Sequence, residues 1–460
     1  MTDGSHAPVL ARTLARRHVE LISLGGVIGA GLFVGSSVAI AAAGPAIVIS
    51  YTVAGLLLLL IMRMLGEMVI VRPDIRAFTD FVLAGLGEGP GFVIGWTYWY
   101  VWTVVVAVES IAGAVLLHAW IPLPVWVMAL FVIGIMWCVN ILSPRTYGEF
   151  EFWFASIKVA AIVAFVLATV GFVFRNAHLG NPDAGLPGLQ NGLMPHGPGA
   201  VVAGIATVFF SLTGAEVATI AAAESNVSTR VVARIAGGLI FRVALFYVLS
   251  VLLMVLILPW REVIPGVSPF TVTLQHMGHA WAAGGMSLVI LTAVLSCLNS
   301  ALYVSSRTLF ALAAHHHAPN WLVTLNSRKA PARAVTFGAV VGAAAVTLAT
   351  VSPNKAFAFL VNATGAIVLL VYLSVAAAYL KMRRSSTNGV GSAWRLAPYP
   401  AIVYVTAAGV VFVLVEMALS KEMAVQLYAS TVPVVIACVA YGLLRRARRQ
   451  ARAGNLQNST

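Results

Sequence analysis

Charged residues are scarce in this sequence. Asp, Glu, Lys and Arg make up 9% of its 460 residues, whereas a soluble domain carries about a quarter. The scarcity argues against an ordinary soluble enzyme. Acidic residues are the rarer kind, 15 against 28 basic ones, and the net charge is +13. We interpret that charge as a signal of membrane topology rather than as a nucleic-acid-binding surface.

Cysteines and local chemical motifs are also few. Cys138, Cys297 and Cys438 lie in apolar segments without metal or disulfide spacing, so we expect packing residues. The sequence contains no nucleotide-binding loop, metal-ligand cluster or nucleophile elbow. We therefore expect neither an ATP-driven pump nor an enzyme, and no cofactor or metal. We interpret the triplet from His315 to His317 as a solvated loop end rather than a metal site.

Long hydrophobic runs dominate what is present. The chain is 60% hydrophobic, and its apolar runs have the roughly 20 residues that a bilayer-spanning helix needs. This pattern predicts an all-α integral membrane protein with twelve transmembrane helices. The predicted spans are 19–43, 46–70, 92–118, 123–143, 151–174, 199–222, 235–258, 282–311, 334–351, 356–380, 399–419 and 425–445.

Basic residues in the loops predict the orientation. An even number of spans puts both termini on one side, and twenty basic residues lie on that side against four on the other. We therefore expect both termini to be cytoplasmic, in a multi-pass protein of the inner (cytoplasmic) membrane. The predicted parts are an N-terminal tail (1–18), a first five-helix repeat (19–174), an extracytoplasmic loop (175–198), a second five-helix repeat (199–380), helices 11 and 12 (381–445) and a basic cytoplasmic tail (446–460).

Two spans carry residues that interrupt a helix. The first contains "SLGGVIGAGLFVG" at 23–35, with five glycines, each costing about 1 kcal/mol relative to alanine inside a helix. The sixth has Ser211, Thr213 and Gly214 at its middle. Interrupted helices five spans apart indicate an inverted-repeat secondary transporter. The alternative is close helix packing through small residues, although bulky Phe33 ends that small-residue series.

The interrupted spans predict a binding site for an amino acid zwitterion. If the first span unwinds between Ile28 and Gly31, the next half-helix starts near Ala30 with free N–H groups, which suit a carboxylate. Carbonyl groups at both breaks can accept from an ammonium group. Phe210 either caps the substrate or is ordinary packing. The candidate substrate-binding residues are Ile28, Gly29, Ala30, Gly31, Phe210, Ser211, Thr213 and Gly214.

Four ionisable residues inside spans are further candidates. Lys158 lies about 11 Å into the fifth span and is a proton-coupling candidate, unless it extends to the interface. Glu109 could bind a substrate amine, relay protons or pair with a cation. Glu216, also a proton-coupling candidate, could couple the break to a substrate or gate, or form a structural ion pair. For Glu67 we predict an ion pair with Arg63, one helical turn away.

The assembled sequence resembles the amino acid–polyamine–organocation superfamily, within it the amino acid transporter family, and most of all bacterial GABA permeases. The stretches that carry the resemblance are "RHVELISLGGVIGAGLFVGSS", "MRMLGEM", "YGEFEFWFASIKV", "GAEVATIAAAES", "CLNSALYVSSRTLFALA" and "ATGAIVLLVYL". The sequence departs from the family where "DIRAF" stands in place of the usual "TGSF".

The resemblance implies a LeuT-type fold of two inverted five-helix repeats with helices 1 and 6 broken. It implies that a substrate carboxylate meets backbone at Ala30 and Gly31, and that the amine meets carbonyls near Ile28 and Phe210. Phe210 would also be the aromatic gate. The ammonium group of Lys158 would stand where sodium-coupled relatives bind their ion, which makes transport depend on protons.

We therefore expect proton-coupled uptake of GABA or a related small amino acid, with the substrate, protons and membrane lipid as partners and no nucleic acid. The alternatives are a permease for another amino acid (proline, alanine or an aromatic one), an amino acid exchanger, or a non-transporting receptor.

Overall fold

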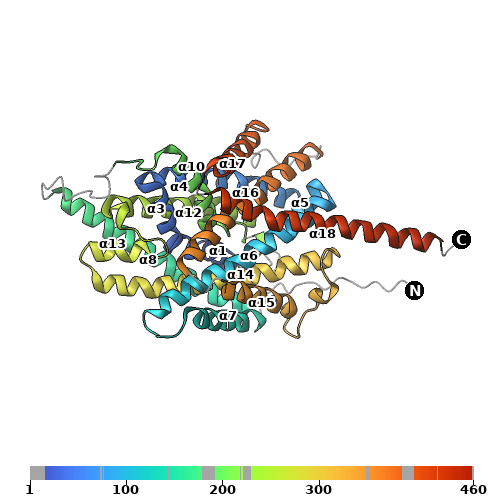
Figure 1. Cartoon of the computed structure of the whole chain (residues 1–460), viewed down its shortest axis with the longest axis horizontal. Helices are drawn as coiled ribbons and strands as arrows, with labels where there is room; N and C mark the ends of the chain where they lie inside the picture. Colours follow the sequence, from blue (N-terminus) through green and yellow to red (C-terminus); the bar gives the residue numbers. More distant parts are fainter. Residues whose placement is uncertain are drawn as a thin grey trace.

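The protein is a bundle of helices joined by turns, as the computed structural model shows (Figure 1). The structure describes residues 16–72, 75, 77–142, 144–178, 192–217, 219–220, 229–348, 353–385, 398–421 and 423–457. The helices are α1 (Arg16–Gly25), α2 (Ala30–Phe33), α3 (Gly35–Ala43), α4 (Ile47–Val71), α5 (Asp80–Leu86), α6 (Glu88–His118), α7 (Val125–Leu142), α8 (Pro144–His178), α10 (Gly197–Leu212), α12 (Thr229–Ile257), α13 (Pro269–His276), α14 (Ala280–Ala314), α15 (Ala332–Leu348), α16 (Pro353–Ser385), α17 (Ala401–Leu419) and α18 (Ala424–Gln457).

Within the described residues, eight stretches are long and apolar enough to cross a membrane. They are Ala30–Val71, Glu88–His118, Val125–Leu142, Thr146–Asn176, Ala280–Ala314, Lys355–Arg384, Ala401–Leu419 and Ala424–Gln450. Three shorter apolar helices are Gly197–Leu212, Arg242–Ile257 and Ala332–Thr347. Each predicted span overlaps one of these helices. The second span and the outer half of the first lie inside Ala30–Val71, and the inner half of the first lies on α1. The number of crossings and the two inverted repeats stay predictions.

Burial separates central from peripheral helices. In an 18-residue apolar stretch of α6, 78% of the residues are buried. The corresponding share is 67% for α14 and 11% for α18. Helix α6 packs against α14, α4 against α12, α1 against α8, and α10 against α4 and α16. An all-round apolar helix must lie either in a core or against lipid. The exposed apolar side chains of α18, such as Val435 and Ile436, therefore fit a lipid-facing surface.

The predicted interruptions are confirmed as breaks in the helices. Helix α1 ends at Gly25 and α2 begins at Ala30, so the break covers Gly26–Gly29, two residues earlier than predicted. Helix α10 ends at Leu212, and Gly214 has φ +109°. Glycine adopts that backbone conformation readily because glycine has no Cβ. The poor helix propensity of both stretches is thus realised as irregular backbone.

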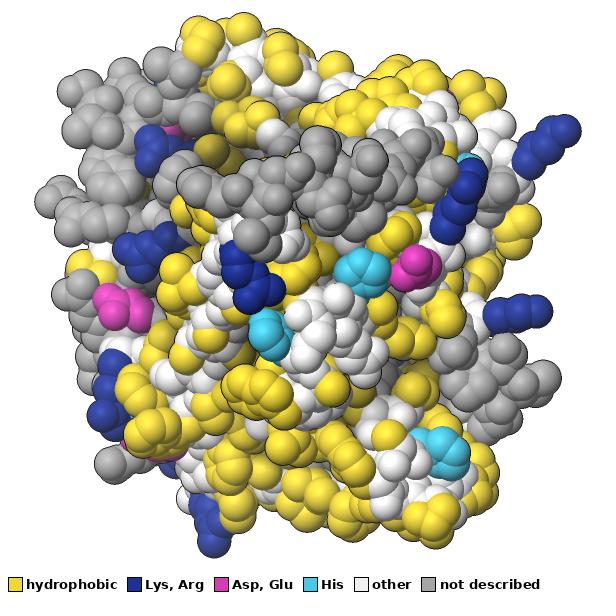
Figure 2. All heavy atoms as spheres, turned by 90° about the vertical axis from the view of Figure 1, so that its left-hand side faces the viewer, with side chains coloured by type: hydrophobic (Ala, Val, Ile, Leu, Met, Phe, Trp, Pro, Cys, Tyr) yellow, Lys and Arg dark blue, Asp and Glu magenta, His cyan; other side chains and the backbone are white. Residues whose placement is uncertain are grey.

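Several predicted boundaries shift. Helix α8 starts at Pro144 rather than near residue 151, and α18 continues through Gln457, so the predicted tail is helical from 446 to 457. Residues 1–15 and 179–191 of the predicted tail and loop lie outside the described residues. Figure 2 views the end of the molecule at the left of Figure 1, where hydrophobic side chains cover much of the surface and charged ones are scattered.

The histidine triplet differs from the prediction of a solvated loop end. The His317 side chain is 4% exposed and its Nε2 lies 3.5 Å from the Glu88 carboxylate, with its ring against Phe92. His315 is more exposed and lies 3.2 Å from the Asp80 carboxylate. The loop after α14 therefore folds back onto the start of α6 and onto α5.

Candidate functional site

The two helix breaks touch each other. A Cβ added to Gly214 would lie 2.3 Å from the carbonyl oxygen of Gly26, and one added to Gly31 would lie 2.6 Å from the Cα of Ser211. Any side chain at either glycine would push the two backbones apart. The Ser211 hydroxyl donates a hydrogen bond of 2.7 Å to the Gly31 carbonyl. The glycines and Ser211 thus bring two segments 180 residues apart into contact.

A buried tyrosine that the sequence analysis missed joins the same two segments. The Tyr247 hydroxyl, on α12, lies 2.8 Å from the carbonyl oxygen of Val27 and 2.9 Å from that of Ser211. One hydroxyl hydrogen is therefore shared between one carbonyl of each break. Tyr247 is fully buried, and its hydroxyl satisfies one carbonyl inside the first break and one in the last turn of α10. The available signal was a single tyrosine within the predicted span 235–258.

The start of α2 holds a carboxylate from the chain itself. The backbone N–H of Ala30 donates to both oxygens of Glu109, at 3.1 and 3.0 Å. Glu109 lies on α6 and is 1% exposed. The N–H predicted to bind a substrate carboxylate is thus already paired with a carboxylate. A Cβ on Gly29 would lie 2.8 Å from Glu109 Oε1 and 2.6 Å from Cys297, so this glycine makes room for Glu109.

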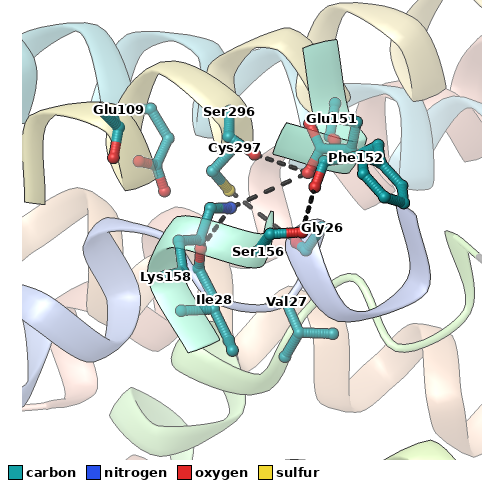
Figure 3. A network of polar contacts seen from close by, with 12 residues as sticks. Gly26, Val27, Ile28, Glu109, Glu151, Phe152, Ser156, Lys158, Ser296 and Cys297 are labelled. Atoms are coloured by element: carbon teal, nitrogen blue, oxygen red, sulfur yellow. Dashed lines mark hydrogen bonds and ion pairs between the residues drawn. The ribbon is translucent and has the colours of Figure 1, made fainter. Parts of the chain in front are cut away.

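The carbonyl side of the same break holds an ammonium group. Lys158 Nζ donates a 2.8 Å hydrogen bond to the Ile28 carbonyl (Figure 3). Because α8 begins at Pro144, Lys158 lies fourteen residues into the helix, about 21 Å at 1.5 Å per residue. The side chain is fully buried, so it does not extend to the membrane interface.

A second buried carboxylate, also missed, faces the lysine. Glu151 Oε1 lies 3.8 Å from Lys158 Nζ, and both side chains have 0% exposure. The Ser296 hydroxyl of α14 donates to the same oxygen at 2.5 Å. Glu151 precedes Lys158 by seven residues, which places both on one face of α8. The seven-residue spacing in "GEFEFWFASIK" is a signal for this pair, although the predicted span begins only at Glu151.

A small pocket lies between the breaks. Its lining residues are Val27, Gly31, Trp102, Val105, Glu109, Phe210, Ser211, Thr213 and Cys297. Five of these are predicted site residues or candidates: Gly31, Glu109, Phe210, Ser211 and Thr213. The free volume is about 10 Å³, room for one water molecule. An amino acid therefore fits only after lining groups move, and Glu109 is the charged one among them.

Glu216 has partners of its own. Its Oε1 accepts from the Tyr98 hydroxyl and its Oε2 from the Tyr372 hydroxyl, both at 2.8 Å, and the Gly214 N–H lies 3.3 Å from Oε2. These partners are neutral donors. The structural ion pair that was one predicted alternative for Glu216 is therefore absent from the described contacts. The carboxylate instead joins the second break to α6 and α16.

The predicted local pair between Glu67 and Arg63 is wrong. The Tyr379 hydroxyl of α16 donates to Glu67 at 2.5 Å, and Arg383 lies 3.4 Å from the same oxygen, while Arg63 is exposed. Helix α16 packs against α4 and supplies these partners. A long-range contact thus replaces the neighbour one turn away.

The helices and the breaks together define a class: a multi-pass helical membrane protein with a buried polar site at two helix interruptions. The amino acid permease family profile matches residues 18–452. The chain belongs to the amino acid permease family. It is therefore a transporter and not an enzyme.

The chain is similar to permeases over nearly its whole length. It is 38% identical over 449 residues to the gamma-aminobutyric acid permease of Bacillus subtilis, covering 96% of each chain. It is 40% identical over 455 residues to the probable GABA permease of Pseudomonas aeruginosa, covering 97% of this chain and 94% of that one. It is 32% identical over 457 residues to the aromatic amino acid transport protein AroP of Escherichia coli K12, covering 98% and 100%.

Proposed function

We propose that the protein carries out proton-coupled uptake of GABA or a related small amino acid across the cytoplasmic membrane. We also propose a LeuT-type fold with twelve spans, two inverted five-helix repeats and both termini cytoplasmic. Membership of the amino acid permease family and similarity to relatives named as GABA permeases support the substrate class. The excess of basic residues on one side of the predicted spans supports the orientation.

One observation carries the proposal: the chain places its own carboxylate and its own ammonium group on the first break. The Ala30 N–H holds Glu109, and the Ile28 carbonyl holds Lys158. An amino acid presents the same two charged groups. The break therefore offers a donor and an acceptor that match a zwitterion, and Glu109 and Lys158 hold those positions when the pocket is contracted.

Binding then exchanges partners at the break. The substrate carboxylate takes the N–H groups of Ala30 and Gly31 and displaces Glu109. The freed Glu109 carboxylate accepts the substrate ammonium group, together with the carbonyl oxygen at Phe210 and that of Ile28 once Lys158 has left it. The Phe210 ring closes over the substrate as a gate. The Ser211 and Thr213 hydroxyls, which line the pocket, contact the part of the substrate between its charged ends.

Coupling to protons rests on the buried ionisable residues. Lys158 stays protonated while it donates to the Ile28 carbonyl and faces Glu151, and it releases the proton when the break moves. Glu109 changes its partner as substrate enters, so whether its carboxylate carries a proton depends on whether substrate is bound. Glu216 links the second break to α6 and α16 through two tyrosines and transmits movement of Gly214 to these helices.

Uptake of labelled GABA into proteoliposomes tests the proposal. We expect accumulation under an inward proton gradient, and its loss when a protonophore collapses the gradient. Lys158→Ala should abolish accumulation, whereas Lys355→Ala, at an exposed lysine near the start of α16, should not. Uptake unaffected by the protonophore would refute the coupling, and full activity of Lys158→Ala would remove the lysine from its role.

Transport of an aromatic amino acid is the second candidate. It is favoured by the 32% identity to the aromatic amino acid transport protein AroP and by Trp102 and Phe210 in the pocket lining. A competition panel of all common amino acids, including proline and alanine, decides between the two. Stronger inhibition of labelled GABA uptake by phenylalanine or tryptophan than by GABA would favour the aromatic substrate. Counterflow without net uptake would identify an exchanger.

A further inference from the structure

We propose that Glu151 is the residue that accepts the proton from Lys158 and passes it toward the cytoplasmic end of α8. This inference rests on the proposed proton coupling and names the residue through which the proton leaves. It starts from a charge imbalance. The Lys158 ammonium lies beside two carboxylates, Glu151 and Glu109, and all three side chains are at most 1% exposed.

Position distinguishes the two carboxylates. Glu109 is held by the Ala30 N–H at the substrate break. Glu151 lies on the opposite side of the lysine, 3.8 Å from Nζ (Figure 3), and two turns nearer the start of α8. Lys158 therefore lies between Glu109 on the substrate side and Glu151 on the side of the helix start. In the proposed orientation the start of α8 is cytoplasmic, so Glu151 lies on the side of release.

Hydroxyl groups continue from Glu151 in the same direction. Ser296 of α14 donates to Glu151 at 2.5 Å. One turn nearer the start of α8, the hydroxyls of Tyr147 and Ser300 lie 3.0 Å apart. All three hydroxyl-bearing side chains are at most 1% exposed. The antiparallel α8 and α14 thus form two successive polar contacts within an apolar interface, which packing alone does not require.

The step balances as a proton transfer. While Lys158 donates to the Ile28 carbonyl, its charge is stabilised by the break and by Glu151. When the break moves, the ammonium loses the carbonyl, and one proton passes from Nζ to Glu151 Oε1. The lysine becomes a neutral amine and Glu151 a neutral acid. The acid then releases its proton to cytoplasmic water past Tyr147 and Ser300, and becomes a carboxylate again.

The test separates net proton-driven transport from exchange. Glu151→Gln keeps an acceptor for Ser296 but does not take up a proton, and Glu151→Asp keeps the carboxylate. Glu149→Gln is the matched control, because Glu149 lies on the same helix, 37% exposed and paired with Arg17. Purified variants in liposomes are assayed for labelled GABA exchange without a gradient, for gradient-driven accumulation, and for internal acidification with a trapped pH dye.

We expect Glu151→Gln to keep exchange within about twofold, and to lose gradient-driven accumulation and internal acidification by about tenfold or more. Glu151→Asp should recover part of both, and Glu149→Gln should match the wild type. Wild-type accumulation in Glu151→Gln would overturn the inference, as would equal loss of exchange in Glu151→Gln and Glu151→Asp, which marks a structural role. Wild-type accumulation that does not depend on the proton gradient would instead refute the proposed coupling itself.

Discussion

Replacing Glu109 by glutamine should change the binding of two related ligands in opposite directions. The Ala30 N–H donates to the Glu109 carboxylate at 3.1 and 3.0 Å, so a ligand carboxylate binds there only after Glu109 has left. The apparent dissociation constant is the intrinsic one divided by the fraction of protein in which Glu109 has left the N–H. Glu109→Gln weakens this internal competitor, because a hydrogen bond to a neutral oxygen is about half as strong as one to a carboxylate.

The magnitude follows from the two kinds of hydrogen bond. A neutral one contributes about 1 kcal/mol and one to a charged group about 2 kcal/mol, so the substitution removes about 1 kcal/mol of competition, which is about fivefold in binding. Butyrate, which has no amino group, should therefore bind Glu109→Gln about fivefold more tightly. GABA gains the same amount, but its ammonium group loses a buried ion pair with the Glu109 carboxylate, which costs about 2 kcal/mol, so GABA should bind about fivefold more weakly.

The assay is competition of butyrate and of unlabelled GABA against labelled substrate on the purified protein, at one fixed pH. Glu149→Gln, at a carboxylate paired with Arg17, is the control and should leave both inhibition constants unchanged. If the inhibition constants of butyrate and GABA shifted in the same direction, Glu109 would not exchange partners between Ala30 and the substrate.

Three further predictions concern the breaks and the loop after α14. Gly214→Ala places a Cβ 2.3 Å from a backbone oxygen at φ +109°, so uptake should fall about tenfold or more, whereas Gly199→Ala, with open space around it, should transport normally; equal activity would mean that the breaks separate easily. Tyr247→Phe leaves two buried carbonyls without their shared donor and should lower the free energy of unfolding by about 1–3 kcal/mol, measured by denaturation in detergent; an unchanged value would show that the hydroxyl is dispensable. The hydrogen bond to Asp80 raises the pKa of His315 above its usual 6.5, so the pair stabilises the fold at low pH and this contribution disappears as the pH rises through the raised value. Asp80→Asn should therefore lower the unfolding temperature slightly at about pH 6 and not at about pH 9, and an equal effect at both would contradict an ionised pair.

Local chemistry explains why the breaks were predictable. Glycine lowers helix propensity wherever it stands, so "GGVIGAG" predicts an interruption without knowledge of its neighbours, and α2 begins at Ala30 as expected. The partners of the freed groups were not predictable in this way. Glu109 lies 79 residues from Ala30 and Lys158 lies 130 residues from Ile28. Such pairings depend on how the helices pack.

The errors have the same origin. The pair of Glu67 with Arg63 was inferred from helical spacing, but Arg383, 316 residues away, lies beside Glu67. A surface ion pair within a helix contributes only about 0.3–0.5 kcal/mol, so packing of α16 against α4 easily overrides it. The burial of His317 similarly depends on α6, which no local pattern around the histidines could indicate.

The opposite charges at the first break also bear on how a carrier returns without its substrate. Unwinding between Gly25 and Ala30 frees a donor and an acceptor, which cost several kcal/mol each if left unsatisfied within a membrane. In the proposed binding mode a bound amino acid satisfies both, but an empty carrier lacks it. Glu109 from α6 and Lys158 from α8 satisfy the same N–H and carbonyl from opposite sides. A broken helix that must be stable both with and without a zwitterion therefore needs charged side chains of both signs within reach, and these side chains must be able to leave.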